Sequence, residues 1–310
     1  MSRTSQCEFS VVITSHNQSA FIMQAVDSVL QQRYPAREVI VVDDGSSDGS
    51  PEMLAQYGGK ISLTRMPCNR GANPARNLGA AKASGDYIVF LDGDDVMFPW
   101  TLDAYARIAQ AKKPKLILSK LFFFSGLFDA KAVPYPEAVQ VCVHEELMRK
   151  DRSFRASASA IVVDRSTFLA AGGWTEDIFP MDDLDLIAKL GYSGEAVQIV
   201  DPPAIGYRLH AANTVQQVQR CMHMIFAIVQ KEERWEYPGG KGRRFERYAL
   251  IGGASWFWIK KGFRNRFYAE ALHLLARTWP LVAASALLRV ILLLRGKSPL
   301  ESIGLGSATG

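Results

Sequence analysis

The sequence predicts an α/β protein with a doubly wound, mainly parallel β-sheet and a C-terminal helical extension. Two observations predict this class. Through about residue 120, short β-branched runs alternate with segments whose apolar residues recur at helical spacing. From about residue 211 the pattern reads as helical to the end. With 310 residues, 48% of them hydrophobic and 22% charged, the chain can bury a core, and its composition excludes disordered and collagen-like classes.

The first hundred residues supply four strands and the helices between them. We expect strands at 10–14, 39–43, 61–66 and 87–91, and helices at 21–30, after Pro51 and at 72–83. Val39 to Asp43 is almost wholly apolar, as expected for a strand buried on both faces. Ligands of such sheets lie beyond the carboxyl ends of the strands, where polar clusters occur at 14–17, 43–48 and 92–95.

The domain division follows the change of pattern along the chain. We expect an α/β domain over residues 1–215, with a regular half at about 1–120 and a more irregular half at about 121–215. Residues 216–310 form the basic, apolar helical region.

Asp92-Gly93-Asp94 follows a buried strand and places two carboxylates on a tight turn. Such hard oxygen ligands suit Mg²⁺ or Mn²⁺ bridged to phosphates. The alternative is an Asp-rich surface turn without an ion. Asp43-Asp44 also ends a buried strand, where it could accept hydrogen bonds from a base or ribose or cap the next helix. No glycine-rich dinucleotide or P-loop motif follows these strands.

Four segments occur in the order and spacing typical of family 2 glycosyltransferases. They are Ser10-Val-Val-Ile-Thr-Ser-His-Asn17, Val41-Val-Asp-Asp-Gly-Ser-Ser-Asp48, Asn69-Arg-Gly-Ala-Asn-Pro-Ala-Arg-Asn-Leu-Gly79 and Phe90-Leu-Asp-Gly-Asp-Asp95. The sequence resembles this family over roughly residues 8–215. The resemblance implies a GT-A fold, a nucleotide-sugar donor, a divalent metal and inversion at the anomeric carbon. It also implies that residues 1–215 are the catalytic domain, with a nucleotide-binding half at about 1–120 and an acceptor half at about 121–215.

The resemblance also implies roles for individual residues. Thr14 and His16 would line the nucleoside, Asp44 would contact the base, Arg76 would lie near the nucleotide and diphosphate, Asp92 would reach the ribose, and Asp94 would coordinate the metal. At Tyr207-Arg208-Leu209-His210, Arg208 could neutralise the diphosphate, and His210 could complete the metal or phosphate contacts. A structural histidine is the alternative.

Asp182-Asp183-Leu184-Asp185-Leu186 resembles the family's Glu-Asp-x-Asp-Leu segment, with Asp182 in place of Glu. We assign Asp183 as the general base, because an acceptor hydroxyl is a weak nucleophile until a carboxylate takes its proton. The alternative is a helix start whose acids complement the macrodipole. Trp174, after two glycines, could stack on a sugar or lie in the core.

The C-terminal part carries the positive charge of the chain. Residues 231–297 hold 14 Lys and Arg against 5 Asp and Glu, a net charge of +9. Trp279 to Leu294 is apolar but spans only about 24 Å as a helix, which predicts an interfacial rather than a membrane-crossing segment. Interleaved basic and aromatic residues upstream favour anionic headgroups. Packing on protein is the alternative, and nucleic acid is not expected.

These observations together predict an inverting, metal-dependent hexosyltransferase that uses a nucleoside diphosphate sugar, a UDP-sugar by expectation. The acceptor would be a hydroxyl of a glycan or lipid-linked saccharide in polysaccharide biosynthesis. We expect cytoplasmic localisation at the inner face of the membrane, since no signal-peptide cleavage site follows the short apolar run at 9–13. The alternative is a noncatalytic sugar-nucleotide-binding or membrane adaptor protein.

Overall fold

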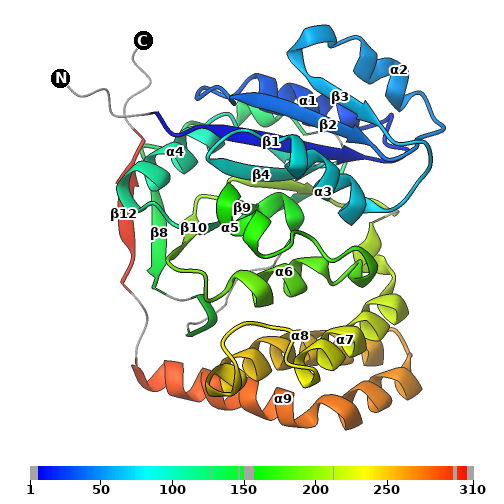
Figure 1. The fold of residues 1–310 in the computed structure, drawn as a ribbon, viewed down its shortest axis with the longest axis vertical. Helices are drawn as coiled ribbons and strands as arrows, with labels where there is room; N and C mark the ends of the chain where they lie inside the picture. Colours follow the sequence, from blue (N-terminus) through cyan, green and yellow to red (C-terminus); the bar gives the residue numbers. More distant parts are fainter. Residues whose placement is uncertain are drawn as a thin grey trace.

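The computed structural model describes residues 6–126, 128–145, 147–149, 157–211, 213–295 and 299–305. A large sheet lies between two layers of helices, and a separate layer of long helices lies below it (Figure 1). The α/β class with a helical C-terminal region is therefore confirmed.

Nine strands of the described chain form the large sheet, in the order β12-β8-β10-β6-β9-β4-β1-β2-β3. They are β1 (Phe9–Ser15), β2 (Glu38–Asp43), β3 (Ser62–Arg65), β4 (Tyr87–Asp92), β6 (Leu116–Leu118), β8 (Ala138–His144), β9 (Ile161–Asp164), β10 (Ala196–Asp201) and β12 (Glu301–Gly304). Strands β3, β2, β1 and β4 are parallel, as the alternating pattern predicted. Beyond β4 the sheet is mixed, because β9 is antiparallel to β4 and β6, and β8 to β10 and β12.

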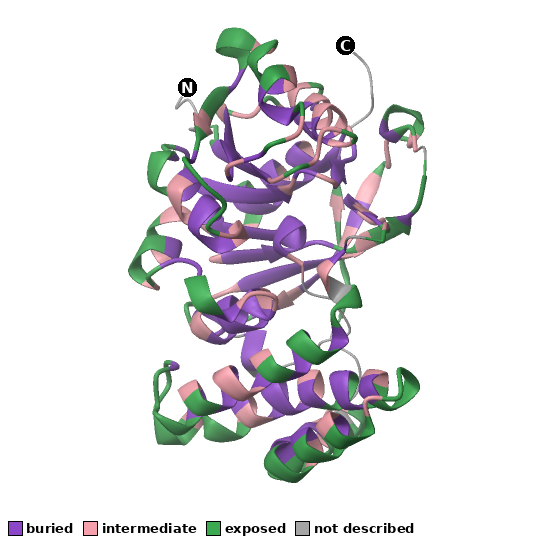
Figure 2. Cartoon of the chain, turned by 90° about the vertical axis from the view of Figure 1, so that its right-hand side faces the viewer, coloured by how far each residue is buried: buried purple, intermediate pink, exposed green. Residues whose placement is uncertain are grey.

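Each central strand is buried on both faces. Val12, Ile40 and Val42 point into one apolar cluster, whereas Val11 and Val41 point into the other. The second cluster is covered by α1 (Ile22–Leu30), α2 (Ser50–Ala55) and α4 (Thr101–Lys112). The first is covered by α3 (Ala72–Lys82), α5 (Arg165–Ala170) and α6 (Asp182–Leu190). Figure 2 shows the buried residues gathered in the strands between these layers. The continuous apolar runs of the sequence thus become a doubly covered sheet.

A small second sheet brings a late segment of the chain to the carboxyl end of β4. It consists of β5 (Val96–Met97), β7 (Leu121–Phe124) and β11 (Ile205–Arg208), with β11 in the middle. Because β5 begins directly after residues 92–95, pairing of β11 with β5 carries Arg208 and His210 to that turn.

Buried ionic contacts join the C-terminal helices to the α/β part of the chain. The Asp185 carboxylate of α6 is fully buried and accepts hydrogen bonds from Lys231 at 2.7 Å and Tyr237 at 2.7 Å. Burial alone would raise the pKa of Asp185, but the partners, led by the Lys189 charge, lower it. Lys231 belongs to α7 (Val218–Glu233), whereas Lys189 belongs to α6 itself, so the buried charge is compensated partly within α6 and partly by the docking of α7.

The remaining helices, α8 (Arg244–Arg264) and α9 (Tyr268–Arg295), pack closely against each other. A Cβ atom on Gly252 would lie 1.8 Å from the Leu281 carbonyl oxygen, so the two backbones touch at this glycine. The expected apolar helix at 279–294 is thus the second half of a 28-residue helix. By length and composition, Tyr268–Leu294 is long and apolar enough to cross a membrane, and only 22% of its most apolar window is buried.

The chain does not stay helical to its end, contrary to expectation. Residues 301–304 form β12, which pairs with β8 at the edge of the large sheet, and Lys112 makes an ion pair with Glu301 at 2.6 Å. Both ends of α9 are therefore tied to the same body: α8 precedes it and β12 follows it. Figure 1 shows α9 lying across the base of the molecule between these attachments.

Candidate active site

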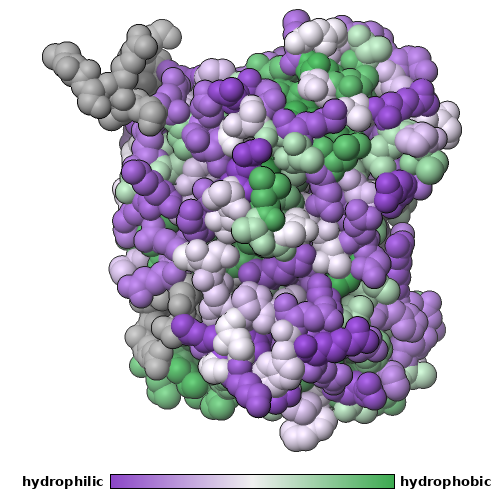
Figure 3. Space-filling view, viewed as in Figure 1, coloured by the Kyte–Doolittle hydropathy of each residue, from purple (hydrophilic) through white to green (hydrophobic). Residues whose placement is uncertain are grey.

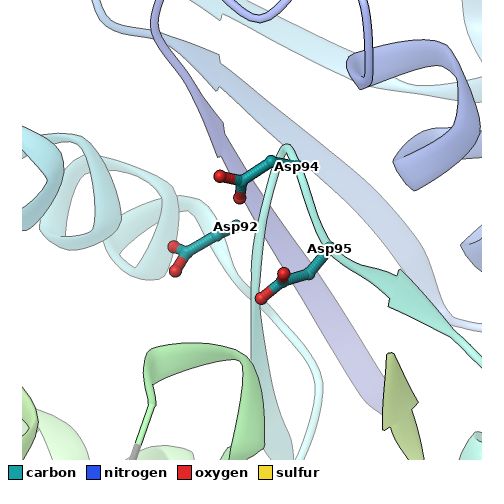
Figure 4. Close-up of side chains that lie close together, drawn as sticks. All are labelled: Asp92, Asp94 and Asp95. Carbon is teal, nitrogen blue, oxygen red and sulfur yellow. The ribbon is translucent and has the colours of Figure 1, made fainter. Parts of the chain in front are cut away.

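Residues 92–95 at the carboxyl end of β4, here named the acidic turn, bring three carboxylates together. Ligand oxygens of Asp92, Asp94 and Asp95 lie within 4.8 Å of one another (Figure 4). The Gly93 N–H donates to the Thr14 carbonyl at 2.9 Å, which ties the turn to β1. A Cβ atom on Gly93 would lie 2.4 Å from the Gln18 side-chain oxygen, so a larger residue at this position would have to displace the Gln18 side chain.

Asp95 is buried and holds the acidic turn in place. Its carboxylate accepts hydrogen bonds from the Ser159 hydroxyl at 2.6 Å and the Arg208 backbone N–H at 3.0 Å. The Ser159 hydroxyl oxygen also accepts the Asp92 N–H at 3.0 Å. Burial, with the charges of Asp94 and Asp92 added, raises the pKa of Asp95 well above its usual range. Asp95 therefore holds the turn, while Asp92 and Asp94 face the cavity.

His210 and Arg208 reach the acidic turn in different ways. The Nε2 atom of His210 lies 2.8 Å from the Asp94 carboxylate, and the ring lines the cavity. The Arg208 guanidinium is buried, donates to the carbonyls of Asp94 at 2.8 Å and Gly126 at 2.9 Å, and also donates to Gln24. These contacts hold Arg208 under the turn, and it does not line the cavity. The family resemblance had instead predicted Arg208 in the cavity, where it would neutralise the diphosphate.

Arg76 connects the acidic turn to the second acidic segment. Its guanidinium donates to Asp92 at 2.7 Å and to Asp182 at 2.6 Å; Arg76 and Asp182 are buried, and Asp92 is partly buried. It lies over the Trp174 ring, 5.0 Å from the centroid. Trp174 itself is buried against Phe90, so it is a core residue and does not present a face to a sugar.

Asp183 lines the cavity beside this ion-paired group. Its carboxylate accepts the Leu184 N–H at 2.7 Å, and no cation contacts it within the described residues. Burial, and next the negative charge of Asp182, raise the pKa of Asp183 to about 7. A carboxylate with that pKa takes up and releases a proton near neutral pH, which suits general-base chemistry.

Thr14, His16 and Asp44 lie together where β1 and β2 end, and all three line the cavity. The Nδ1 atom of His16 is 2.8 Å from the Asp44 carbonyl oxygen. The Asp44 carboxylate accepts the backbone N–H groups of Arg70 at 2.8 Å and Gly71 at 2.7 Å. Asp44 thus shapes the loop before α3 as well as bordering the cavity.

One cavity of about 1980 Å³ connects the acidic turn, Asp183 and the ends of β1 and β2. Eight of the nine expected site residues line it: Thr14, His16, Asp44, Arg76, Asp92, Asp94, Asp183 and His210. Sequence reasoning missed the supporting role of Asp95 and the contribution of Ser159. Asp95 stood in the acidic run as a visible signal, whereas nothing in the sequence connects Ser159 with a turn 64 residues earlier.

Comparison with known proteins identifies the class. Residues 10–146 match the family described as Glycosyl transferase family 2. The matched segment, less than half of the chain, is thus similar to family 2 glycosyltransferases. Asp183, Arg208 and His210 lie beyond the matched residues. The chain covers 38%, 36% and 52% of the length of three curated glycosyltransferase relatives.

One relative and two solved structures give the nearest chemical context. The chain is 42% identical over 89 residues to a putative teichuronic acid biosynthesis glycosyltransferase, TuaG, of Bacillus subtilis, covering 28% of this chain and 35% of that one. It is similar to S. aureus TarS 1-349 in complex with UDP-GlcNAc (TM-score 0.66, 16% identity, 89% and 81% covered). It is also similar to the mannosyltransferase PcManGT of Pyrobaculum calidifontis in complex with GDP-Man and Mn²⁺ (TM-score 0.53, 18% identity, 95% and 89% covered). The fold is therefore GT-A.

Replacing Arg76 with Met should lower the free energy of unfolding by about 3 to 5 kcal/mol, because Asp92 and Asp182 would lose their shared buried cation. Urea denaturation measures the change. The matched control is Arg37→Met, which breaks an exposed ion pair with Glu8 and should cost at most about 1 kcal/mol. Equal losses in the two variants would contradict the central place given to Arg76.

Proposed function

We propose that this chain is an inverting, metal-dependent glycosyltransferase. It moves a hexose from a nucleoside diphosphate sugar, with a UDP-sugar as donor, to a hydroxyl of a glycan or lipid-linked saccharide in polysaccharide biosynthesis. The observation that carries the proposal is the placement of Asp183, whose pKa is about 7, on the same cavity as Asp92 and Asp94. Arg76 holds the two acidic segments at a fixed separation.

The donor nucleotide would occupy the end of the cavity formed by β1, β2 and the acidic turn. Thr14 and His16 would line the nucleoside, Asp44 the base and Asp92 the ribose, which matches their positions on one wall. UDP-GlcNAc in TarS and GDP-Man in PcManGT, both of similar fold, support a nucleotide-sugar donor.

The acidic turn has the donor chemistry that Mg²⁺ or Mn²⁺ requires. Its carboxylate oxygens converge, and Asp94 is turned toward the cavity while Asp95 is occupied by Ser159. Asp94 and His210 would hold the ion, and a bound divalent cation would supply positive charge to the departing diphosphate. The Mn²⁺ in PcManGT supports this assignment.

Transfer is a single in-line displacement at the anomeric carbon. The acceptor oxygen forms a bond to C1 while the bond between C1 and the diphosphate oxygen breaks, and the nucleoside diphosphate leaves with that electron pair. Asp183 takes the acceptor hydroxyl proton as the new bond forms. One displacement inverts the configuration. Arg76 keeps Asp182 paired, and Arg208 positions the acidic turn through the Asp94 carbonyl.

The donor class is tested by release of nucleoside diphosphate from a panel of nucleotide sugars, with a membrane extract as acceptor source. We expect release from a UDP-sugar with Mn²⁺ or Mg²⁺ and none with EDTA. Asp94→Asn should weaken metal-dependent donor binding in calorimetry by about 10-fold or more. If no donor is turned over and no nucleotide binds with metal, the adaptor alternative replaces the enzyme.

Asp183→Asn should lower turnover by about 100-fold or more while leaving donor binding unchanged, because the amide cannot accept the proton. In the wild type, kcat/KM for the acceptor should fall as pH drops below about 7, where Asp183 becomes protonated. Asp177→Asn, on an exposed carboxylate outside the cavity, is the matched control. Full turnover by Asp183→Asn would refute the assignment of the base.

The helical region supports peripheral contact with the inner face of the cytoplasmic membrane. Figure 3 shows a hydrophobic area at the lower left, over the C-terminal half of α9. Leu287, Val290 and Leu294 recur there at helical spacing and are 53%, 52% and 83% exposed. A spanning α9 would have to pull β12 away from β8, whereas an in-plane helix leaves both of its attachments intact.

Sedimentation with vesicles of anionic phospholipid tests this contact. The wild type should pellet with the vesicles, and the triple replacement Leu287→Ser, Val290→Ser and Leu294→Ser should remain in the supernatant. Leu63→Ser is the control, since Leu63 is an exposed leucine on β3, in the catalytic half. Equal pelleting of the triple variant and the control would contradict membrane contact through α9.

A further inference from the structure

The cavity is larger than a sugar nucleotide requires. Pockets for small ligands usually measure about 300 to 1,000 Å³, and this one measures about 1980 Å³. Beyond Asp183 its wall passes to residues of α8 and α9, which we name the apolar arm of the cavity. The described residues of these helices that form it include Leu250, Ala254, Phe257, Leu288 and Leu292.

The apolar arm is bordered by a face of α9 that is buried in the first part of the helix and partly exposed further along it. Leu274, Leu281 and Leu288 are seven residues apart and therefore lie on one face. Leu274 and Leu281 are buried, whereas Leu288 is half-buried and borders the cavity. A protein core does not leave such a face open without cost, because apolar surface exposed to water is unfavourable.

Two arginines add a second kind of chemistry to the same wall. Arg220 of α7 lies 5.5 Å from the ring centroid of Phe179, four residues before Asp183, and Arg289 follows Leu288 on α9. Both are exposed and line the cavity, and neither has a carboxylate partner among the described residues. Unpaired guanidinium groups beside an apolar wall suit an anionic head attached to a hydrocarbon chain.

We propose that the apolar arm binds the hydrocarbon chain of a phosphorylated lipid acceptor, with Arg220 and Arg289 contacting its phosphate. This inference rests on the proposed function, because it names the acceptor of the same site. The hydrocarbon chain of the lipid lies between α8 and α9, and the saccharide hydroxyl extends toward Asp183. The exposed face of α9 beside the apolar arm contacts the membrane that supplies the lipid.

Calorimetry with monomeric n-octyl, n-decyl and n-dodecyl phosphate tests the proposal without requiring glycosyl transfer. Each added methylene that enters the arm should raise affinity by about 4-fold, with one molecule bound per chain. Arg289→Gln should weaken the binding of all three alkyl phosphates by a similar factor. It should leave unchanged the gain in affinity for each added methylene, which we call the increment with chain length. If inorganic phosphate binds as tightly as dodecyl phosphate, the arm is a phosphate site only and the proposal fails.

Ala254→Phe should fill the arm and remove most of the increment with chain length. Ala286→Phe, an identical replacement at an exposed α9 position outside the cavity, should keep it. Leu292→Gln provides a second variant, which should reduce the increment without adding bulk. An unchanged far-ultraviolet circular dichroism spectrum and an unchanged midpoint of thermal unfolding show that a variant is folded.

The results separate this inference from the proposed function. An undiminished increment in both Ala254→Phe and Leu292→Gln overturns the apolar arm even if a UDP-sugar is turned over. Binding only to intact vesicles, equal in Ala254→Phe and Ala286→Phe, also overturns it and leaves a membrane-contacting surface. Conversely, a normal increment with no binding of any nucleotide upholds the lipid site and refutes the transferase.

Discussion

The buried guanidinium of Arg76 is the interaction on which the rest of the site depends. It lies between the Asp92 carboxylate at the end of β4 and the Asp182 carboxylate at the start of α6, which are far apart in the sequence. Without a shared cation, Asp92 and Asp182 would repel each other in a region of low dielectric, where charges are weakly screened. The pairing fixes the separation of the acidic turn from Asp183, and under the proposed function that separation is the space in which donor and acceptor would meet.

Helix α6 connects the Arg76 ion pairs to the layer formed by α7, α8 and α9. Asp182 at its start is held by Arg76, and Asp185 one turn further is held by Lys231 of α7 and by Tyr237. The helix is therefore fixed at two levels, and Asp183 between them has little freedom to move. The same docking places α8 and α9 beside the cavity, so that one surface continues from charged groups that suit phosphate chemistry to apolar groups that suit a hydrocarbon chain.

Much of the fold could be predicted because local pattern and final environment agree. The mainly apolar run Val39–Asp43 predicts a strand that is buried on both faces. The polar residues after each strand indicate the edge of the sheet that borders the cavity. A strand at about residues 158–163 is visible in the sequence, and β9 confirms it, but the pattern predicted neither its antiparallel direction nor β12, because antiparallel pairing at these places depends on contacts between distant segments. The apolar segment of α9 also extends further than its most hydrophobic stretch indicated.

By itself the sequence determined the class of fold, the resemblance to family 2 glycosyltransferases and eight of the residues that border the cavity, since motifs at strand ends are local features. Tertiary structure alone decided what each charge does. Arg208 and His210 are two residues apart, yet one is enclosed under the acidic turn and the other borders the cavity beside Asp94. Their roles differ because burial and available partners, which come from segments far away in the chain, decide whether a charged group holds the structure or faces a ligand.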